Sequence, residues 1–246
     1  MKNFGVHLCL DKGNTRVKAG IFKNNNLLLM QVYDVFGAYE LETLRNRFLP
    51  TSCILCNVGE PDDALIRLLN TTFEQFILFD NTTILPIIIK YKTPETLGKD
   101  RIAAVVGAQW LKPNTNLLVV DAGTAITYDL IDASGIYHGG NIAAGLEMRL
   151  KALHAFTKRL PLVQPNAEVD FMGNNTVNAL SAGALYGIQF EINGYFDTLK
   201  IKYPELSLFL TGGDLNYFAS KLKSPIFAEK NLVLIGLSRI IQCNVV

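Results

Sequence analysis

The sequence of 246 residues has little excess charge, few cysteines and no long apolar run. Its formal net charge is +1, whereas domains that bind nucleic acid usually carry a basic bias, so we expect no nucleic acid as a partner. The apolar runs are shorter than the roughly 18–20 residues that a membrane helix needs, and no signal-peptide pattern is present. These absences predict a cytoplasmic protein that acts away from membranes.

Only four cysteines are present, and two of them, Cys53 and Cys56, form a C-x-x-C pattern. Such a pattern can bind zinc or take part in redox chemistry. Here it lies inside residues 51–58, which have the pattern of a buried strand, and this spacing sends the two side chains to opposite faces. We therefore expect both thiols in the core, because they cannot hold one metal ion together.

The composition favours large cores and an alternating order of elements. Hydrophobic residues make up 49%, and at this length they suffice for one large or two medium domains. Strand and helix patterns alternate, which is typical of an α/β fold. A polar stretch with a helix breaker at residues 112–116 predicts a boundary between two domains, 1–115 and 116–246. The predicted strands are residues 4–10, 17–22, 27–32, 52–58, 76–79, 86–89, 117–120, 126–131, 136–138 and 206–210. The predicted helices are residues 40–48, 61–69, 101–111, 146–156, 177–201 and 215–221, and a closing segment covers 232–243.

Two short stretches, residues 10–15 and 120–124, repeat one pattern. In each, an apolar strand ends in Asp, a Gly follows two residues later, a Thr comes soon after, and a second strand begins. A turn with Gly brings backbone N–H groups close to an anion. One copy alone would also suit an ordinary hairpin, because turns favour Asp and Asn. The second copy favours a duplicated domain that holds a nucleotide's phosphates from both sides.

The first of these stretches has the residue types that phosphoryl transfer needs, namely a metal ligand, N–H donors and positive charge. Asp11 can hold Mg²⁺ through water, and Lys18 can reach the phosphates. Gly13, Asn14 and Thr15 supply N–H groups of the turn and short polar side chains. We therefore expect this hairpin to bind a nucleotide.

A third polar stretch, residues 91–101, leads from a predicted strand into a predicted helix. Asp100 stands where the helix N-cap would lie, and Asp is a favoured N-cap. The same carboxylate could be a general base for a hydroxyl nucleophile, because a loose phosphoryl-transfer transition state asks mainly for positioning. The local pattern does not decide between these interpretations.

Two other positions have weaker patterns. Residues 211–214, Thr-Gly-Gly-Asp, follow a predicted strand, and the two glycines could contact an adenosine or simply permit a tight turn. Thr176 precedes a long helical pattern, and an N-cap is its simplest interpretation.

Together these motifs resemble type III pantothenate kinases. The order and spacing of that family's motifs are kept through nearly the whole chain, and the Leu-Gly-x-Asp-Arg segment that ends at Arg101 is the specific part. The two hairpins alone would indicate only the wider superfamily of actin, sugar kinases and heat-shock ATPases. The matching segments are residues 11–18, 93–101, 120–125, 139–140, 160–161 and 211–213.

The resemblance implies an α/β fold of two duplicated ribonuclease-H-like (actin-like ATPase) domains, with ATP in the cleft between the domains. It implies phosphorylation of pantothenate to 4′-phosphopantothenate, the first step of coenzyme A biosynthesis, by a homodimer. It also implies Mg²⁺, a monovalent cation (K⁺ or NH₄⁺) at Asp121, and Asp100 as the group that takes the proton of the attacking hydroxyl. The implied ATP contacts are Asp11, Lys12, Gly13, Asn14, Thr15, Arg16, Val17, Lys18 and Thr124. The implied pantothenate contacts are Tyr91, Gly98, Lys99, Asp100, Arg101 and Thr176.

One position departs from the family pattern, and two alternatives stay open. Ala144 stands where the family usually has Pro, at the start of a predicted helix. A sugar or acetate kinase of the same superfamily would keep the hairpins but need not keep residues 93–101. A non-catalytic regulatory module is the other alternative, since relatives have been described as transcription accessory factors. The intact Asp100 and both hairpins count against it.

Overall fold

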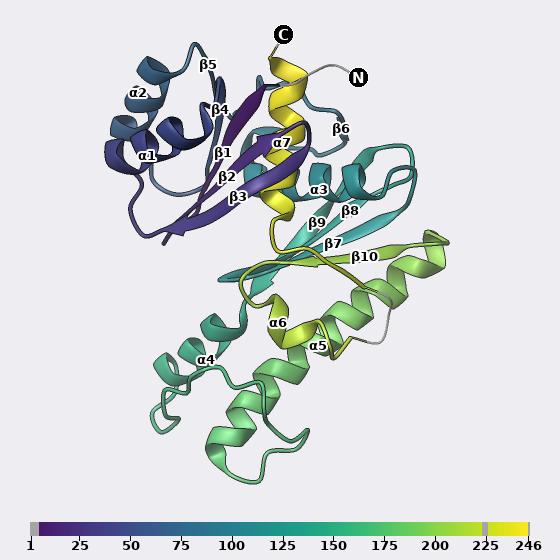
Figure 1. Cartoon of the computed structure of the whole chain (residues 1–246). Helices are drawn as coiled ribbons and strands as arrows, with labels where there is room; N and C mark the ends of the chain where they lie inside the picture. Colours follow the sequence, from purple (N-terminus) through teal and green to yellow (C-terminus); the bar gives the residue numbers. More distant parts are fainter. Residues whose placement is uncertain (1–4, 223–225, 246) are drawn as a thin grey trace. The chain divides into compact units, whose positions relative to one another are not determined.

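The computed structural model describes residues 5–222 and 226–245, and its strands form two sheets (Figure 1). The first sheet has the order β3-β2-β1-β4-β5. Strands β1 to β3 pair antiparallel, whereas β4 and β5 add in parallel. Asn24 and Asn25 turn β2 into β3 with φ of 47° and 70°, a left-handed conformation that Asn tolerates in tight hairpins. The strands are β1 (Val6–Lys12), β2 (Val17–Lys23), β3 (Asn26–Tyr33), β4 (Ser52–Asn57) and β5 (Gln75–Leu78).

The second sheet repeats this strand order and confirms the predicted duplication in an α/β fold. Its order is β11-β10-β7-β8-β9-β6, so that β7 takes the place of β1. Strand β8 pairs antiparallel on one side of β7, β10 pairs parallel on the other, and β11 adds parallel beyond β10. Strand β6 is an addition at the β9 edge. The strands are β6 (Ile88–Ile89), β7 (Leu117–Ala122), β8 (Ala125–Ile131), β9 (Ile136–Ala144), β10 (Ser207–Thr211) and β11 (Ile226–Ala228).

Each predicted helix is present, with ends that differ by at most three residues. The closing segment forms a helix, α7, and a short 3₁₀ helix, η1, precedes α3. The helices are α1 (Ala38–Phe48), α2 (Asp63–Thr72), η1 (Pro94–Thr96), α3 (Lys99–Leu111), α4 (Leu146–Ala155), α5 (Thr176–Lys202), α6 (Leu215–Phe218) and α7 (Leu232–Asn244).

Most strands end within two residues of the prediction, and two depart from it further. Strand β9 continues to Ala144, beyond the predicted end at His138, because the ladder carries it through Gly139 and Gly140, which local strand propensity disfavours. Strand β11 was not predicted, and its three residues are too few to give a pattern. The predicted first strand starts at Phe4, which lies outside the described residues.

Alternating side chains of the first sheet face two different layers of helices. Leu8 and Leu10 share one core with Leu41 of α1 and Leu65 of α2. On the opposite face α7 contacts β1, β2 and β4, and it lies beside these strands in Figure 1 (yellow). Because side chains alternate along a strand, Asp11 points to this α7 face, away from the core that holds Leu10.

The two cysteines of the C-x-x-C pattern lie where the strand geometry predicts. Cys53 packs in the core with Leu8, and Cys56 lies on the other face, where the charges of Asp11 and Asp100 act on it. Both are buried free thiols. Burial raises the pKa of each thiol well above its usual value, so neither has the character of a reactive cysteine.

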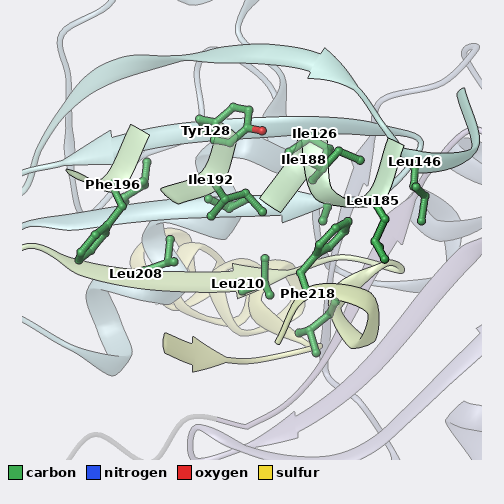
Figure 2. Close-up of a cluster of buried hydrophobic side chains, with 14 of the residues drawn as sticks. Ile126, Tyr128, Leu146, Leu185, Ile188, Ile192, Phe196, Leu208, Leu210 and Phe218 are labelled. Atoms are coloured by element: carbon green, nitrogen blue, oxygen red, sulfur yellow. The ribbon is translucent and has the colours of Figure 1, made fainter. Parts of the chain in front are cut away.

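Helix α5 covers one face of the second sheet and forms the second core with α4 and α6 (Figure 2). Apolar side chains repeat at helical spacing along α5 and at alternate positions along β8 and β10, so the two periodic faces bury each other. The labelled members of this core are Ile126, Tyr128, Leu146, Leu185, Ile188, Ile192, Phe196, Leu208, Leu210 and Phe218.

Helices α3 and α7 cross with their backbones in contact. A Cβ atom at Gly236 would lie 1.8 Å from the carbonyl oxygen of Ala103, and one at Gly107 would lie 2.3 Å from that of Leu232. Only glycine permits so close an approach. The crossing fixes the position of α3, whose first residues belong to the polar stretch of residues 91–101.

The chain divides into two compact units. The first contains the described residues through 113, residues 135–137 and the described residues from 231 onward, and the second contains residues 114–134 and the described part of 138–230. The domain division at 115/116 stays a prediction. Within the described residues, every helix is too short or too polar to span a membrane.

Candidate active site

The first Asp-Gly hairpin connects β1 to β2 and carries a pocket at its turn. Asp11 stands opposite Lys18 across the two strands, and the N–H of Gly13 donates to the carbonyl of Arg16 at 3.0 Å. The pocket has a volume of about 240 Å³. Its walls are Lys12, Gly13, Asn14, Thr15, Arg16, Val17, Asp34, Gly59 and Glu60. The structure therefore brings six of the predicted ATP contacts around one cavity.

Two basic side chains of this turn are paired with acids. Lys12 Nζ lies 3.0 Å from Asp62 Oδ2, and Asp62 also accepts the N–H of Leu65 at 3.0 Å as the N-cap of α2. The Leu65 N–H and Lys12 hold the pKa of Asp62 below its usual value. Arg16 Nε donates to Asp34 Oδ1 at 3.0 Å in a solvent-exposed pair. Exposed ion pairs have small net energies, so Arg16 can turn to a phosphate at little cost.

Asp11 is a buried carboxylate, with 9% of its surface exposed. Burial raises its pKa to about 6; the neighbouring Lys18 lowers the pKa and Asp100 raises it. The charge of Asp100, in the first turn of α3, thus acts on Asp11 at the end of β1. A metal ion or a cationic ligand group that compensates this negative charge would be favoured here.

The structure corrects the N-cap interpretation of Asp100. Gly98 is the N-cap of α3, and Asp100 is the second helical residue, with its Oδ1 accepting the N–H of Arg101 at 2.8 Å. The N-terminus of a helix carries partial positive charge, so an acidic side chain is well placed in this first turn. A Cβ atom at Gly98 would lie 2.6 Å from Asp100 Oδ1, so glycine leaves the room that this carboxylate occupies.

The residues on either side of Asp100 are held by contacts that differ in burial. Lys99 Nζ donates to Asn81 Oδ1 at 2.6 Å in an exposed contact. Arg101 is buried, and its Nη2 donates to the hydroxyl of Tyr137 at 3.1 Å. The ring of Tyr137 lies 6.2 Å from that of Tyr91, between centroids. Within the first unit, the structure thus links two predicted pantothenate contacts, Tyr91 and Arg101, through Tyr137, whereas the side chain of Lys99 contacts Asn81.

Tyr137 is a member of this group that sequence reasoning missed. It is separated from Arg101 by 36 positions, and its only signal in the sequence was a place in the predicted strand 136–138. Its exposed fraction is 0%, although it has a polar hydroxyl. A fully buried tyrosine needs a partner for that hydroxyl, and Arg101 is one.

The second hairpin connects β7 to β8, and two glycine loops pack against it. The N–H of Gly145 donates to the carbonyl of Thr124 at 3.1 Å. Gly212 has a φ of 97°, and a Cβ atom there would lie 2.5 Å from Asp121 Oδ1. The Thr-Gly-Gly-Asp stretch therefore places backbone against the carboxylate of the hairpin, as the glycine pair allows. Within the second unit, Asp121 and Thr124 lie on this one turn.

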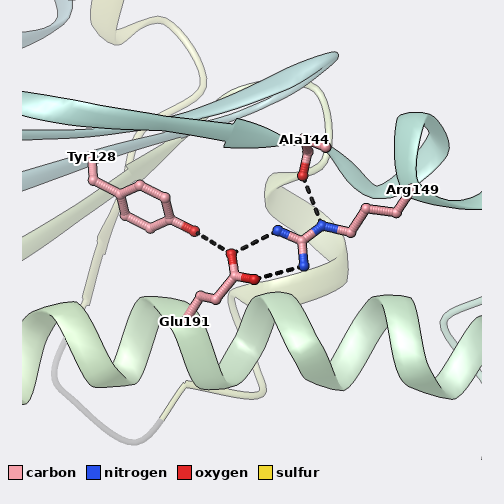
Figure 3. Close-up of polar contacts among 4 residues, drawn as sticks. All are labelled: Tyr128, Ala144, Arg149 and Glu191. Carbon is pink, nitrogen blue, oxygen red and sulfur yellow. Dashed lines mark hydrogen bonds and ion pairs between the residues drawn. The ribbon is translucent and has the colours of Figure 1, made fainter. Parts of the chain in front are cut away.

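An ion pair holds the segment that leads into α4 (Figure 3). The guanidinium of Arg149 donates to both carboxylate oxygens of Glu191, at 2.7 and 2.6 Å, and through Nε to the carbonyl of Ala144 at 2.8 Å. The hydroxyl of Tyr128 donates to the same carboxylate at 3.3 Å. Arg149 lowers the pKa of Glu191 below its usual value, which keeps the pair charged. Ala144, where the family usually has Pro, is thus held through its carbonyl.

The N-cap interpretation of Thr176 is also wrong. Asn175 is the N-cap of α5, and its Oδ1 accepts the N–H of Asn178 at 3.0 Å, because Asn is at least as good a cap as Thr. Thr176 is the first helical residue and is exposed. Its side chain is therefore available to a ligand, but it belongs to the second unit.

The carboxylates of Asp11 and Asp100 suit Mg²⁺, which keeps water and phosphate ligands, better than a metal ion whose ligands all come from the protein. Among the described residues, no group of three or more His, Cys, Asp or Glu side chains could hold a metal ion. Mg²⁺ is usually bound by one or two carboxylates together with substrate phosphates and water. Asp11, with Asp100 nearby and a pocket at the same turn, matches that pattern.

Comparisons with known sequences agree with these motifs. The sequence model of type III pantothenate kinases matches residues 7–198. The chain belongs to the type III pantothenate kinase family. The type III pantothenate kinase of Bacteroides fragilis (strain YCH46) is 46% identical over 240 residues, which cover 97% of this chain and 98% of that relative. The one from Phocaeicola vulgatus is 44% identical over 239 residues, which cover 97% and 99%.

Solved structures agree on the fold. A Campylobacter jejuni protein, described provisionally as a Baf family transcriptional activator, is 27% identical with a TM-score of 0.58, and the match covers 96% of this chain and 98% of that one. A ROK family glucokinase from Streptomyces griseus is 10% identical with a TM-score of 0.52, and covers 97% and 100%. The type III pantothenate kinase family therefore shares its duplicated α/β fold with sugar kinases, as the resemblance implied.

Proposed function

We propose that this chain transfers the terminal phosphate of ATP to pantothenate and forms 4′-phosphopantothenate, the first step of coenzyme A biosynthesis. Membership of the type III pantothenate kinase family along nearly the whole chain carries this proposal. The neighbouring carboxylates of Asp11 and Asp100 supply the two functions that the reaction requires: a metal ligand on the nucleotide side and a base on the acceptor side.

The nucleotide side of the proposal rests on the first hairpin. Its pocket-lining residues 12–17 would contact ATP, and Lys18 would compensate phosphate charge beside Asp11. Asp11 would hold Mg²⁺, which when bound neutralises charge on the phosphates. Thr124, exposed at the turn of the second hairpin, would be a further ATP contact.

The acceptor side rests on the start of α3. Pantothenate has a primary alcohol at one end and a carboxylate at the other. Asp100 would take the proton of the alcohol as its oxygen bonds to the terminal phosphorus and the bond from that phosphorus to ADP breaks. Arg101 is a suitable donor to the acceptor. The remaining proposed pantothenate contacts are Tyr91, Gly98, Lys99 and Thr176.

Three further parts of the proposal rest on the family resemblance. Asp121 would hold a monovalent cation, K⁺ or NH₄⁺, and the cytoplasm would be the location. The active form would be a homodimer. Light scattering should give twice the mass of one chain, and the mass of a single chain would contradict the dimer.

The proposal is tested by measuring ADP release with pantothenate, glucose or acetate as acceptor, in K⁺ and in Na⁺. We expect ADP release with pantothenate but not with glucose or acetate, and we expect a faster rate in K⁺ than in Na⁺. Release with glucose or acetate but not with pantothenate would instead identify a sugar or acetate kinase of the same fold.

A regulatory module remains the second candidate, because the Campylobacter jejuni protein described as a Baf family transcriptional activator has the same fold at 27% identity. The same assay separates the two functions. Absence of turnover with all three acceptors would favour the regulatory module, whereas turnover with pantothenate would contradict a purely regulatory role.

A further inference from the structure

Tyr137 contacts both ends of the polar stretch that contains Asp100. At the end of the stretch, its hydroxyl accepts a hydrogen bond of 3.1 Å from Arg101 Nη2. At the start, its backbone carbonyl accepts the N–H of Lys90 at 2.9 Å, and Lys90 directly precedes Tyr91. Its ring also lies 6.2 Å from the ring of Tyr91. One residue thus touches the two ends of an eleven-residue segment, 91–101.

The surroundings of Tyr137 give these contacts a fixed geometry. Strand β9 places Tyr137 opposite Ile89 of β6 in parallel register, so the backbone at this point belongs to a sheet. Tyr137 is 0% exposed and Arg101 is 7% exposed. A guanidinium that is this buried needs hydrogen-bond acceptors. The hydroxyl of a buried tyrosine whose backbone is held in a sheet can be such an acceptor and can hold the guanidinium in one orientation.

From this geometry we propose that Tyr137 is a positioning residue for the acceptor site, which acts by orienting the guanidinium of Arg101. The inference rests on the proposed function, in which Arg101 and Tyr91 contact pantothenate. The ring and backbone of Tyr137 shape the segment, whereas its hydroxyl sets the direction of Arg101. The hydroxyl accepts its bond from Arg101, which belongs to the acceptor side of the proposed site, so its loss should weaken acceptor binding more than ATP binding.

The test is the Tyr137→Phe variant, which keeps the ring and the backbone bond and removes the hydroxyl. We expect the KM for pantothenate to rise about 10-fold, in line with the loss of a hydrogen bond to a charged group. The KM for ATP should stay within about twofold and kcat within about threefold of the unsubstituted enzyme. Tyr186→Phe removes a tyrosine hydroxyl that donates to the carbonyl of Val169 in the second unit, and it should leave the KM for pantothenate unchanged.

A double substitution shows whether Tyr137 acts through Arg101. If it does, Tyr137→Phe should add little to the KM effect of Arg101→Lys, because coupled residues are not additive. Full additivity would overturn the inference, as would an unchanged KM for pantothenate in Tyr137→Phe or an equal rise in the KM for ATP. If the unsubstituted enzyme does not phosphorylate pantothenate, the proposed function is overturned, and this inference with it. If the enzyme does so but Tyr137→Phe leaves the KM for pantothenate unchanged, only this inference is overturned.

Discussion

Asp11 is the residue at which stability and the proposed chemistry oppose each other. Burial and the charge of Asp100 raise its pKa to about 6, although Lys18 acts in the other direction. An unfolded chain would release this proton near pH 3.9. Between about pH 4 and 6 the native state therefore binds more protons than the unfolded state, and stability falls as pH rises through this window. Above pH 6, the ionised carboxylate of Asp11 lowers the free energy of unfolding by roughly 2–3 kcal/mol.

The substitution Asp11→Asn should therefore raise the melting temperature at pH 7.5 by a few degrees and lower kcat/KM for MgATP strongly. At pH 4.5 the stability difference should shrink, because the native Asp11 is then protonated and resembles Asn. Thermal unfolding at the two pH values measures the first effect and steady-state kinetics the second. A lower melting temperature at pH 7.5 would show that the carboxylate is stabilising instead.

Among the elements, α3 bears most directly on the proposed site, because Asp100 and Arg101 lie in its first turn and its middle is fixed against α7. The contact at Gly236 leaves no room for a Cβ atom, which would lie 1.8 Å from backbone. A side chain there must push the two helices apart and disturb the first turn of α3.

Gly236→Ala should lower the free energy of unfolding by about 1–3 kcal/mol or more, because overpacking against backbone cannot relax. Gly194→Ala is the matched control in α5, since among the described residues a Cβ atom there would meet nothing within 4 Å beyond its chain neighbours and the nearby backbone of its own helix. It should be neutral or stabilising by up to about 1 kcal/mol, as expected for Ala in a helix. Chemical denaturation of both variants measures this, and an equal effect of the two would contradict the close crossing.

Elements that interact locally were predictable, and those that depend on distant partners were not. Strand alternation and turn residues predict β1, β2, β7 and β8, because each hairpin is complete within a few residues. The continuation of β9 through Gly139 and Gly140 depends on pairing with a neighbouring strand, which no local pattern shows. The caps were misplaced by one or two residues, at Gly98 and Asn175, because several adjacent polar residues could each serve as a cap.

The same division holds for the candidate site. The motif residues of the first hairpin and of α3 were predictable because each motif is contiguous. Tyr137 was not, because its contact with Arg101 joins residues that are 36 positions apart. The pairing of Lys12 with Asp62 was likewise invisible, since it needs the first sheet to place α2 next to the turn.

For the whole molecule, the duplicated strand order gives two equivalent hairpins, one in each unit, and the proposal assigns them different ions. Asp11 would serve Mg²⁺ and Asp121 the monovalent cation. Gly212 packs a backbone turn against Asp121, so the two carboxylates have different surroundings despite their equivalent positions.

Asp121→Ala should therefore abolish the activation by K⁺. At saturating Mg²⁺, the variant should keep the lower activity that the unsubstituted enzyme has in Na⁺. Initial rates across K⁺ and Mg²⁺ concentrations measure this separation. Undiminished K⁺ dependence in the variant would move the monovalent cation to another place in the chain.

Asp100, whose charge acts on Asp11, is the proposed base for the acceptor hydroxyl. The turnover of Asp100→Asn with pantothenate, measured together with the affinity for ATP, decides whether Asp100 has this role. We predict that kcat falls by roughly 10²–10⁴-fold while the dissociation constant for ATP changes little. A variant that turns over at nearly the normal rate would contradict the claim and leave Asp100 with only a structural role at the start of α3.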